Sequence, residues 1–320
     1  IDSELEIDVT TLAAATNSGH VRIFDVAGGL TIGTIGGTIG ASVTGPAAAA
    51  SIAIRAAGPL TVNSPVTNSV GGNVTLAAQG STVADDLAIN ASIAATGGTG
   101  TISLYAGDSA TLASGVAVNA ASTGQVLVFA GTNYNGGSPV AGTSTGDFTM
   151  ASSASVQSSA GNVRLQASRN ANLSSVSGVG VLVDAEVDIT DTNAGANNIA
   201  ASNLALRASA GAIGNGNALE TTVTNLSAQA ASGVGGSIEV ANTGALTIIQ
   251  QTIFGVQVAA AASRAMSGGG YATISAASPI TVASNVVMGG AVNLTAGETA
   301  TEDVDDLIVN AGVTVQSTGS

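Results

Sequence analysis

Two pairs of adjacent aspartates are the residues whose spacing points most directly to chemistry. Asp85-Asp86 recurs as Asp305-Asp306, and further acids precede the second pair at Glu298, Glu302 and Asp303. Hard cations such as calcium take several oxygen ligands, which adjacent carboxylates and turn carbonyls supply. Asp85, Asp86, Asp305 and Asp306 are therefore the candidate metal ligands, and calcium is the only cofactor that the sequence suggests. Solvated turns are the favoured alternative, because no Gly-Gly-x-Gly-x-Asp calcium repeat accompanies the pairs.

A second acidic stretch contains Asp184, Glu186, Asp188 and Asp191, which alternate with apolar residues. On a single strand these acids would share one face and form a groove for a cation or a substrate. An enzyme acting on polysaccharides would need such carboxylates beside a basic residue, or a carboxylate pair at a defined separation. The nearest arginines in sequence are Arg169 and Arg207, and only three tyrosines are available as sugar platforms. Catalysis is therefore not predicted.

The remaining residue patterns exclude several kinds of site. His20 is the only histidine, which rules out sites with several histidine ligands and disfavours a Ser-His-Asp triad. The glycine-rich stretch from Gly29 to Gly40 has no lysine and no following helix pattern, so we expect tight turns and no phosphate loop.

Composition indicates an ordered chain with a narrow interior. The 320 residues include 43 glycines, no cysteine and no tryptophan, yet 45% are apolar, mostly Ala, Val, Ile and Leu. A net charge of −14, with six arginines and no lysine, argues against binding to nucleic acid phosphates. Glycine and polar residues interrupt every apolar stretch before it reaches 18 residues, so no membrane span is predicted.

Short runs with apolar residues at alternate positions recur about every 30 residues, for example at Val21–Ile23, Val74–Leu76 and Ile102–Leu104. Each run predicts a strand, and weaker runs lie between them. Two or three strands per 30-residue coil describe an all-β parallel β-helix, or β-solenoid, of about ten or more coils. An antiparallel immunoglobulin-like array is the alternative, which the scarcity of aromatic residues disfavours. Residues 47–57 and 256–265 are predicted to be either short helices or irregular loops.

A much longer repeat is superimposed on these strands. The segment that starts at Glu6 returns from Glu220 onward, with offsets of 214 to 220 residues, and Val74 and Leu76 correspond to Val292 and Leu294. We therefore predict a single continuous solenoid over residues 1–320, with residues 6–219 as the first copy and 220–320 as a partial second copy. The chain is expected to be a fragment of a longer protein.

The repeated units resemble those of a known family. Gly72–Ala78 and Gly161–Ala167 share the pattern Gly-Asn-Val-x-Leu-x-Ala, and Asp85 and Asp305 each begin Asp-Asp-Leu-x-Ile/Val-Asn-Ala. These units are similar to the repeats of filamentous-haemagglutinin-type exoproteins and giant bacterial surface adhesins. The resemblance implies a right-handed parallel β-helix that is secreted across an outer membrane and acts as a stalk or adhesive filament.

The function expected from these observations is that of a non-enzymatic extracellular or cell-surface rod, structural or adhesive, within a giant filamentous bacterial protein. The alternative is a β-helical carbohydrate-active enzyme or a module that binds sugars or cations. The expected partners are neighbouring repeats of the same polypeptide, with lateral self-association or a host or cell-surface ligand as further candidates. Nucleic acid is not an expected partner.

Overall fold

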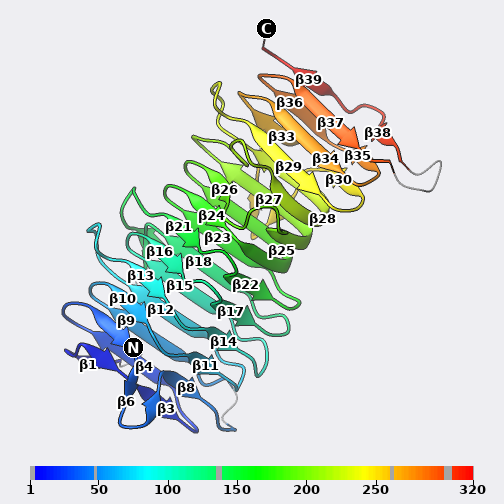
Figure 1. The fold of residues 1–320 in the computed structure, drawn as a ribbon. Coiled ribbons are helices and arrows are strands. Elements are labelled where there is room, and N and C mark those ends of the chain that lie inside the picture. Colours follow the sequence, from blue (N-terminus) through cyan, green and yellow to red (C-terminus); the bar gives the residue numbers. More distant parts are fainter. Residues whose placement is uncertain (1–3, 47–48, 135–138, 260–262, 299–304, 320) are drawn as a thin grey trace. The chain divides into compact units, whose positions relative to one another are not determined.

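The computed structural model describes residues 4–46, 49–134, 139–259, 263–298 and 305–319. Over these residues the chain is all-β, as the alternating pattern predicted, with long parallel sheets and no helix (Figure 1). No described helix is long and apolar enough to cross a membrane. The chain divides into two compact units, Ile1–Arg169 and Asn170–Ser320, which we call unit 1 and unit 2.

Unit 1 consists of three rows of parallel strands, and three consecutive strands, one from each row, make a layer. Row 1 contains β1 (Leu5–Ile7), β4 (Val21–Asp25), β9 (Ile52–Ala56), β12 (Val74–Ala78), β15 (Ile102–Ala106), β18 (Val126–Ala130) and β23 (Val163–Ala167). Row 2 contains β2 (Thr11–Leu12), β5 (Leu30–Ile32), β10 (Leu60–Val62), β13 (Leu87–Ile89), β16 (Ala110–Leu112) and β21 (Phe148–Met150). Row 3 contains β3 (Ala14–Thr16), β8 (Ala41–Val43), β11 (Val66–Asn68), β14 (Ile93–Ala95), β17 (Ala117–Ala120) and β22 (Ser155–Ser158).

Unit 2 begins with long strands and ends with the same short ones. β24 (Ala171–Leu173) pairs with β26 (Ile189–Asp191), while β25 (Ser175–Ala185), β27 (Ile199–Ala208) and β28 (Leu219–Gln229) stack in parallel. Successive parts of β28 then pair with β29 (Ile238–Asn242), β30 (Leu246–Ile248) and β33 (Arg264–Gly268). Two further layers follow, made of β34 (Ala272–Ala276), β35 (Ile280–Val282) and β36 (Asn285–Met288), and of β37 (Val292–Ala296), β38 (Leu307–Val309) and β39 (Val315–Ser317).

In the described ranges, three antiparallel hairpins interrupt the layers: β6 (Thr34–Ile35) with β7 (Thr38–Ile39), β19 (Thr132–Tyr134) with β20 (Pro139–Ala141), and β31 (Thr252–Ile253) with β32 (Val256–Gln257). Gly36 and Gly37 turn the first hairpin with φ of +54° and +90°, which confirms the turns predicted for the glycine-rich stretch. The third hairpin packs Ile253 against the outward side chains of Leu182 and Ala205.

The interior is apolar, as composition predicted. Along row 1 every second side chain points inward, and Ile54, Leu76, Leu104 and Val128 are fully buried. Phe148 at the start of β21 is the largest fully buried side chain of the described residues. Most outward positions of the same strands are partly exposed, and three of them carry Arg22, Arg55 and Arg164. Arg207 takes the equivalent outward position in β27 of unit 2.

A line of glycines brings the layers of unit 1 close together. Gly72, Gly100, Gly124 and Gly161 each stand two residues before a row 1 strand. A Cβ atom on any of them would overlap a carbonyl oxygen of the equivalent residue one layer earlier, at Ala50, Gly72, Gly100 and Gly124 respectively. None of these four glycines has a positive φ, so close approach of two backbones explains the residue type. This contact explains the glycine that begins the Gly-Asn-Val-x-Leu-x-Ala pattern at Gly72 and Gly161.

The strand order repeats between the two units in the way that the sequence offsets suggest. The six strands β9 to β14 correspond to β34 to β39, with the same parallel pairing between layers. The N–H of Leu60 donates to the carbonyl oxygen of Asp86, and the N–H of Ile280 donates likewise to Asp306. No helix occupies the described parts of residues 47–57 or 256–265, whereas residues 47–48 and 260–262 lie outside the described residues. The copy boundary at residues 219 and 220 stays a prediction.

Candidate functional site

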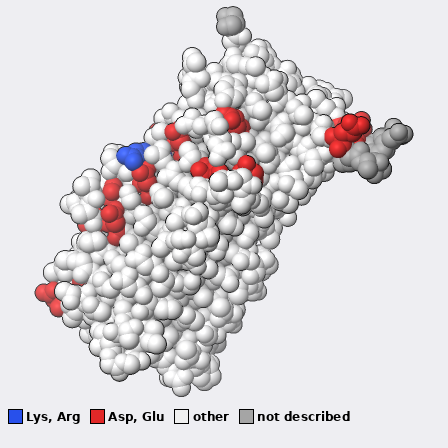
Figure 2. Space-filling model, viewed as in Figure 1, with Lys and Arg blue, Asp and Glu red and all other residues white. Residues whose placement is uncertain are grey.

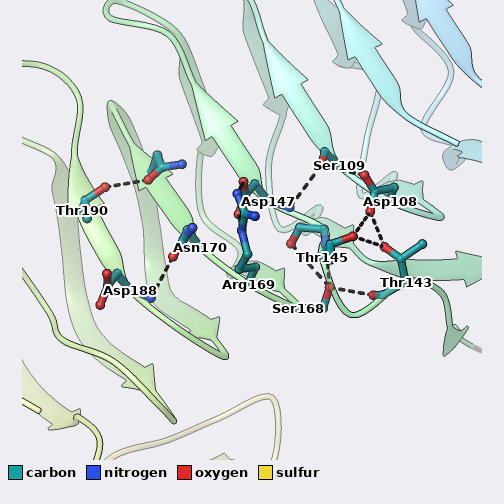
Figure 3. A network of polar contacts seen from close by, with 12 residues as sticks. Asp108, Ser109, Thr143, Thr145, Asp147, Ser168, Arg169, Asn170, Asp188 and Thr190 are labelled. Atoms are coloured by element: carbon teal, nitrogen blue, oxygen red, sulfur yellow. Dashed lines mark hydrogen bonds and ion pairs between the residues drawn. The ribbon is translucent and has the colours of Figure 1, made fainter. Parts of the chain in front are cut away.

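Carboxylates gather in unit 1 where the chain enters the strands of row 2. Asp86, Ser109 and Asp147 immediately precede β13, β16 and β21, and the parallel register of these strands stacks the three residues on one another. Asp85 and Asp108 occupy the position before that. The result is a file of carboxylates along one edge of the sheet, part of which Figure 3 shows. We call Asp85, Asp86, Asp108 and Asp147 the acidic edge.

Asp85 and Asp86, the first pair of the acidic edge, have different surroundings. Asp85 is only 5% exposed, and its Oδ2 accepts hydrogen bonds from the N–H (2.7 Å) and the hydroxyl (2.8 Å) of Thr82. Gly80 makes room for it, because a Cβ there would overlap this carboxylate. Asp86 points to the next layer, where its Oδ1 accepts from the N–H of Ser109 at 3.0 Å. Thus the two carboxylates bind different partners.

Asp86 also carries an electrostatic cost. Burial raises the pKa of its carboxyl group above the ordinary value, against the hydrogen bond from Ser109, which lowers it. The neighbouring carboxylates of Asp108 and Asp85 repel the charged form and raise the pKa further. The ionised form of Asp86 is therefore disfavoured in the folded protein.

Asp108 anchors the segment that follows the hairpin β19–β20. Its Oδ1 accepts hydrogen bonds from the hydroxyls of Thr143 and Thr145, the latter at 2.8 Å, and the Ser109 hydroxyl donates to its Oδ2 at 3.2 Å (Figure 3). Asp147 is held in a bidentate ion pair by Arg169, whose Nε donates to Oδ1 at 2.8 Å. These bonds link successive layers, so the described acidic edge has the geometry of a structural network.

Asp305 and Asp306 do not reproduce the environment of the first pair. Asp306 is exposed and Asp305 partly exposed, whereas Asp85 is buried. Glu298 is the counterpart of Gly80, where a side chain would overlap the carboxylate of Asp85. The described residues contain no group of three or more His, Asp or Glu side chains that could hold a metal ion, while Glu302 and Asp303 lie outside them. Calcium binding at Asp85, Asp86, Asp305 and Asp306 stays a prediction.

The acids between Asp184 and Asp191 do not share one strand face, so that expectation was wrong. Strand β25 ends at Ala185, the chain bends at residues 186–187, and β26 starts at Ile189. Asp184 is buried in a bidentate ion pair with Arg207, whose Nε donates at 2.7 Å. Asp188 lies beyond the bend and accepts from the N–H of Ala212 at 2.8 Å. An arginine does stand beside one acid of this stretch, and it neutralises that acid.

Asp191 accepts four hydrogen bonds, more than any other described carboxylate of unit 2. It accepts from the N–H groups of Asn193 (2.6 Å) and Ala194 (3.1 Å) and from the side-chain amides of Asn198 and Asn217, both at 2.7 Å. Burial alone would raise the pKa of Asp191, but these four donors outweigh it and hold the pKa below the ordinary value. Asp191 therefore fixes a corner between layers as a charged acceptor.

Sequence reasoning missed an aromatic cluster on the outside of row 1. Tyr105 stacks on Phe129 with 5.0 Å between ring centroids, and Tyr134 of the hairpin β19–β20 packs against Tyr105 at the same distance. Tyr105 and Phe129 are both buried under this hairpin, so they are no platform for a sugar. The sequence did contain a signal for this contact, because Tyr105 and Phe129 are the fourth residues of two successive row 1 strands. His20 is exposed, and its Nδ1 accepts from the N–H of Ser51 at 2.9 Å, which fits a surface turn.

On the face shown in Figure 2, the acidic side chains lie in small patches, and most of the surface is neither acidic nor basic. Several of the described carboxylates accept hydrogen bonds from a neighbouring layer or loop, among them Asp86, Asp108, Asp147, Asp184, Asp188 and Asp191. The chain matches no protein-family model, no curated protein and no solved structure.

Proposed function

We propose that this chain is a non-enzymatic structural module of an extracellular or cell-surface filamentous protein, built as a right-handed parallel β-helix with coils of about 30 residues. The observation that carries the proposal is the stacking itself. In each unit, parallel strands follow one another in register over a buried interior of Ile, Val, Leu and Ala. A stack of this kind is stable only through its neighbours and suits a protein whose task is to extend or to bear load.

The polar residues support the same function. Asp108, Asp147, Asp184 and Asp191 each bond to a neighbouring layer or loop, and the donors come from the protein itself. A catalytic carboxylate needs a pKa and a geometry matched to a substrate. The pKa of Asp191 is instead lowered by donors that immobilise it, which is the behaviour of a fixed structural anion.

Stretching the chain between its two ends by single-molecule force spectroscopy tests this proposal. If layers detach one after another, each event releases roughly one coil of about 30 residues, or about 10 nm of extended chain. We expect a series of such steps, and we expect the glycine variants described in the Discussion to lower the forces of the steps in unit 1. A single low-force transition without steps would contradict a load-bearing role.

A further inference from the structure

Within the part of the chain that the structure describes, Arg264 is the one arginine whose guanidinium group makes no ion pair or hydrogen bond. Arg55, Arg169 and Arg207 form ion pairs with acids, Arg164 donates to Gln166, and Arg22 also has an interaction. Among the described residues, no acid or hydrogen-bond acceptor pairs with Arg264. A guanidinium group carries five donors, so an arginine without a partner in a chain of net charge −14 calls for an explanation.

Arg264 lines a groove of about 490 Å³ on the outside of unit 2. The groove follows β28, β33 and β36, where register places Gln229, Ser267 and Val287 side by side in successive layers. Ser209, Ser232 and Ser267 bring hydroxyl groups to its wall, and the described lining contains no aspartate or glutamate. The groove therefore combines one cation with several neutral hydrogen-bonding groups.

A second groove of about 460 Å³ adjoins the first and shares Val234, Gly269 and Gly289 with it. Val234, at the tip of its loop, is 93% exposed. Tyr271 lines the second groove and is 41% exposed, in contrast to the buried Tyr105 of unit 1. Its hydroxyl donates to Glu239 and so is held in place. An exposed aromatic ring of fixed position is thus available beside the groove that holds Arg264.

Gly269 and Gly289, which line both grooves, have a structural explanation. A Cβ on Gly269 would overlap the carbonyl oxygen of Ser232, and a Cβ on Gly289 would overlap that of Gly269. Close stacking of layers requires both residues. The groups of the two grooves that are free to contact a ligand are the guanidinium of Arg264, the serine hydroxyls and the ring of Tyr271.

We propose that these two grooves bind an oligosaccharide that carries carboxylate groups, such as an oligomer of uronic acids. The planar fork of Arg264 matches a carboxylate in a bidentate arrangement. Ser209, Ser232 and Ser267 match sugar hydroxyls, and the ring of Tyr271 supports the apolar face of an adjoining sugar. Volumes of this size are ordinary for small-ligand sites. This binding site goes beyond the structural role and does not depend on it.

The test is calorimetric titration of the whole chain with unsulfated trigalacturonic acid and with its full methyl ester, in about 0.15 M salt so that distant charges are screened. The ester has the same sugar backbone and hydroxyls but no charge. We expect the acid to bind at least about tenfold more tightly than the ester, as a charge-assisted pair with Arg264 requires. Equal affinity for acid and ester, or no binding of the acid at millimolar concentration, would overturn the proposal without any variant.

Variants locate the site. Arg264→Gln should weaken binding of the acid about tenfold or more and leave the ester unaffected. Arg169→Gln is the matched control, because it changes the net charge equally, lies in unit 1 and should leave both affinities unchanged. Tyr271→Ala should weaken binding several-fold, whereas Tyr271→Phe keeps the ring and should stay within about twofold of the parent. An effect of Arg169→Gln as large as that of Arg264→Gln would show that only net charge matters and would refute the site.

Discussion

Replacing Gly100 by alanine should weaken the stack of unit 1, although the change adds only one methyl group. The new Cβ would lie 2.2 Å from the carbonyl oxygen of Gly72, and real Cβ atoms almost never approach another atom within 3.0 Å. The two layers must therefore separate locally by about 1 Å, which is roughly a fifth of the 4.8 Å spacing between strands. Overpacking of this kind costs about 1–3 kcal/mol.

Gly19→Ala is the matched control. Gly19 also stands two residues before a row 1 strand, but a Cβ there would meet only the Thr16 hydroxyl at an ordinary 3.5 Å. Since this substitution fits the existing backbone, it should be neutral or stabilise the protein by up to about 1 kcal/mol.

Native-state hydrogen exchange is the suitable assay, because stacked repeats do not always unfold in a two-state manner. In Gly100→Ala, the free energy of opening of the amides in β12 and β15 should fall by about 1–3 kcal/mol, with smaller changes in distant layers. If the amides of β12 and β15 are equally protected from exchange in Gly100→Ala and in Gly19→Ala, the proposed role of the glycines in layer contact is refuted.

Three further substitutions have defined outcomes. Phe148→Ala empties the largest buried site of row 2 and should lower the free energy of unfolding by about 3–5 kcal/mol, measured by urea denaturation. The pKa of Asp191 is lowered in the folded state, so the ionised carboxylate stabilises the fold above the unfolded pKa of about 4. This stabilisation is lost as the pH falls through the folded pKa. Asp191→Asn should therefore lower the free energy of unfolding at pH 7 and do so progressively less toward pH 3. The pKa of Asp86 is raised in the folded state, so its ionised form destabilises the fold at pH 7. Asp86→Asn keeps an oxygen acceptor for the N–H of Ser109 and should raise the free energy of unfolding at pH 7. This increase should disappear at acidic pH, where Asp86 of the unsubstituted protein is itself protonated. A pH-independent difference in either aspartate series would contradict the assigned cause.

The strands and the interior of this protein could be predicted because the signal for them is local. Val74 and Leu76 alternate with polar residues, and a strand places such residues on one face whatever surrounds it. The glycine that stands two residues before β12 and β23 was visible as part of a repeated pattern, but its cause is a contact with a residue one layer away, as between Gly100 and Gly72. Sequence spacing alone does not reveal such a contact.

The candidate sites were predictable only in part, because they depend on where layers meet. Asp184 to Asp191 alternates like a strand, yet the chain bends after Ala185, and the N–H of Ala212 in the next layer takes Asp188 as its acceptor. Asp85 and Asp86 are adjacent in sequence but turn to different partners. Nothing in the sequence around Arg264 distinguishes it from the other arginines. Only the structure shows that the others have partners, whereas Arg264 has none among the described residues.

The register between layers is the central claim, and paired nitroxide labels test it most directly. The chain contains no cysteine, so two introduced cysteines are labelled without further change. Thr75 and Ser103 are outward partners in adjacent strands, and Ser103 pairs in turn with Leu127. We predict strong dipolar broadening of the electron paramagnetic resonance spectrum for labels at 75 and 103, whose backbones lie about 5 Å apart, and weaker broadening for 75 and 127 at about 10 Å. Spectra of the 75/103 pair that equal the sum of the two single-label spectra would contradict the parallel stacking.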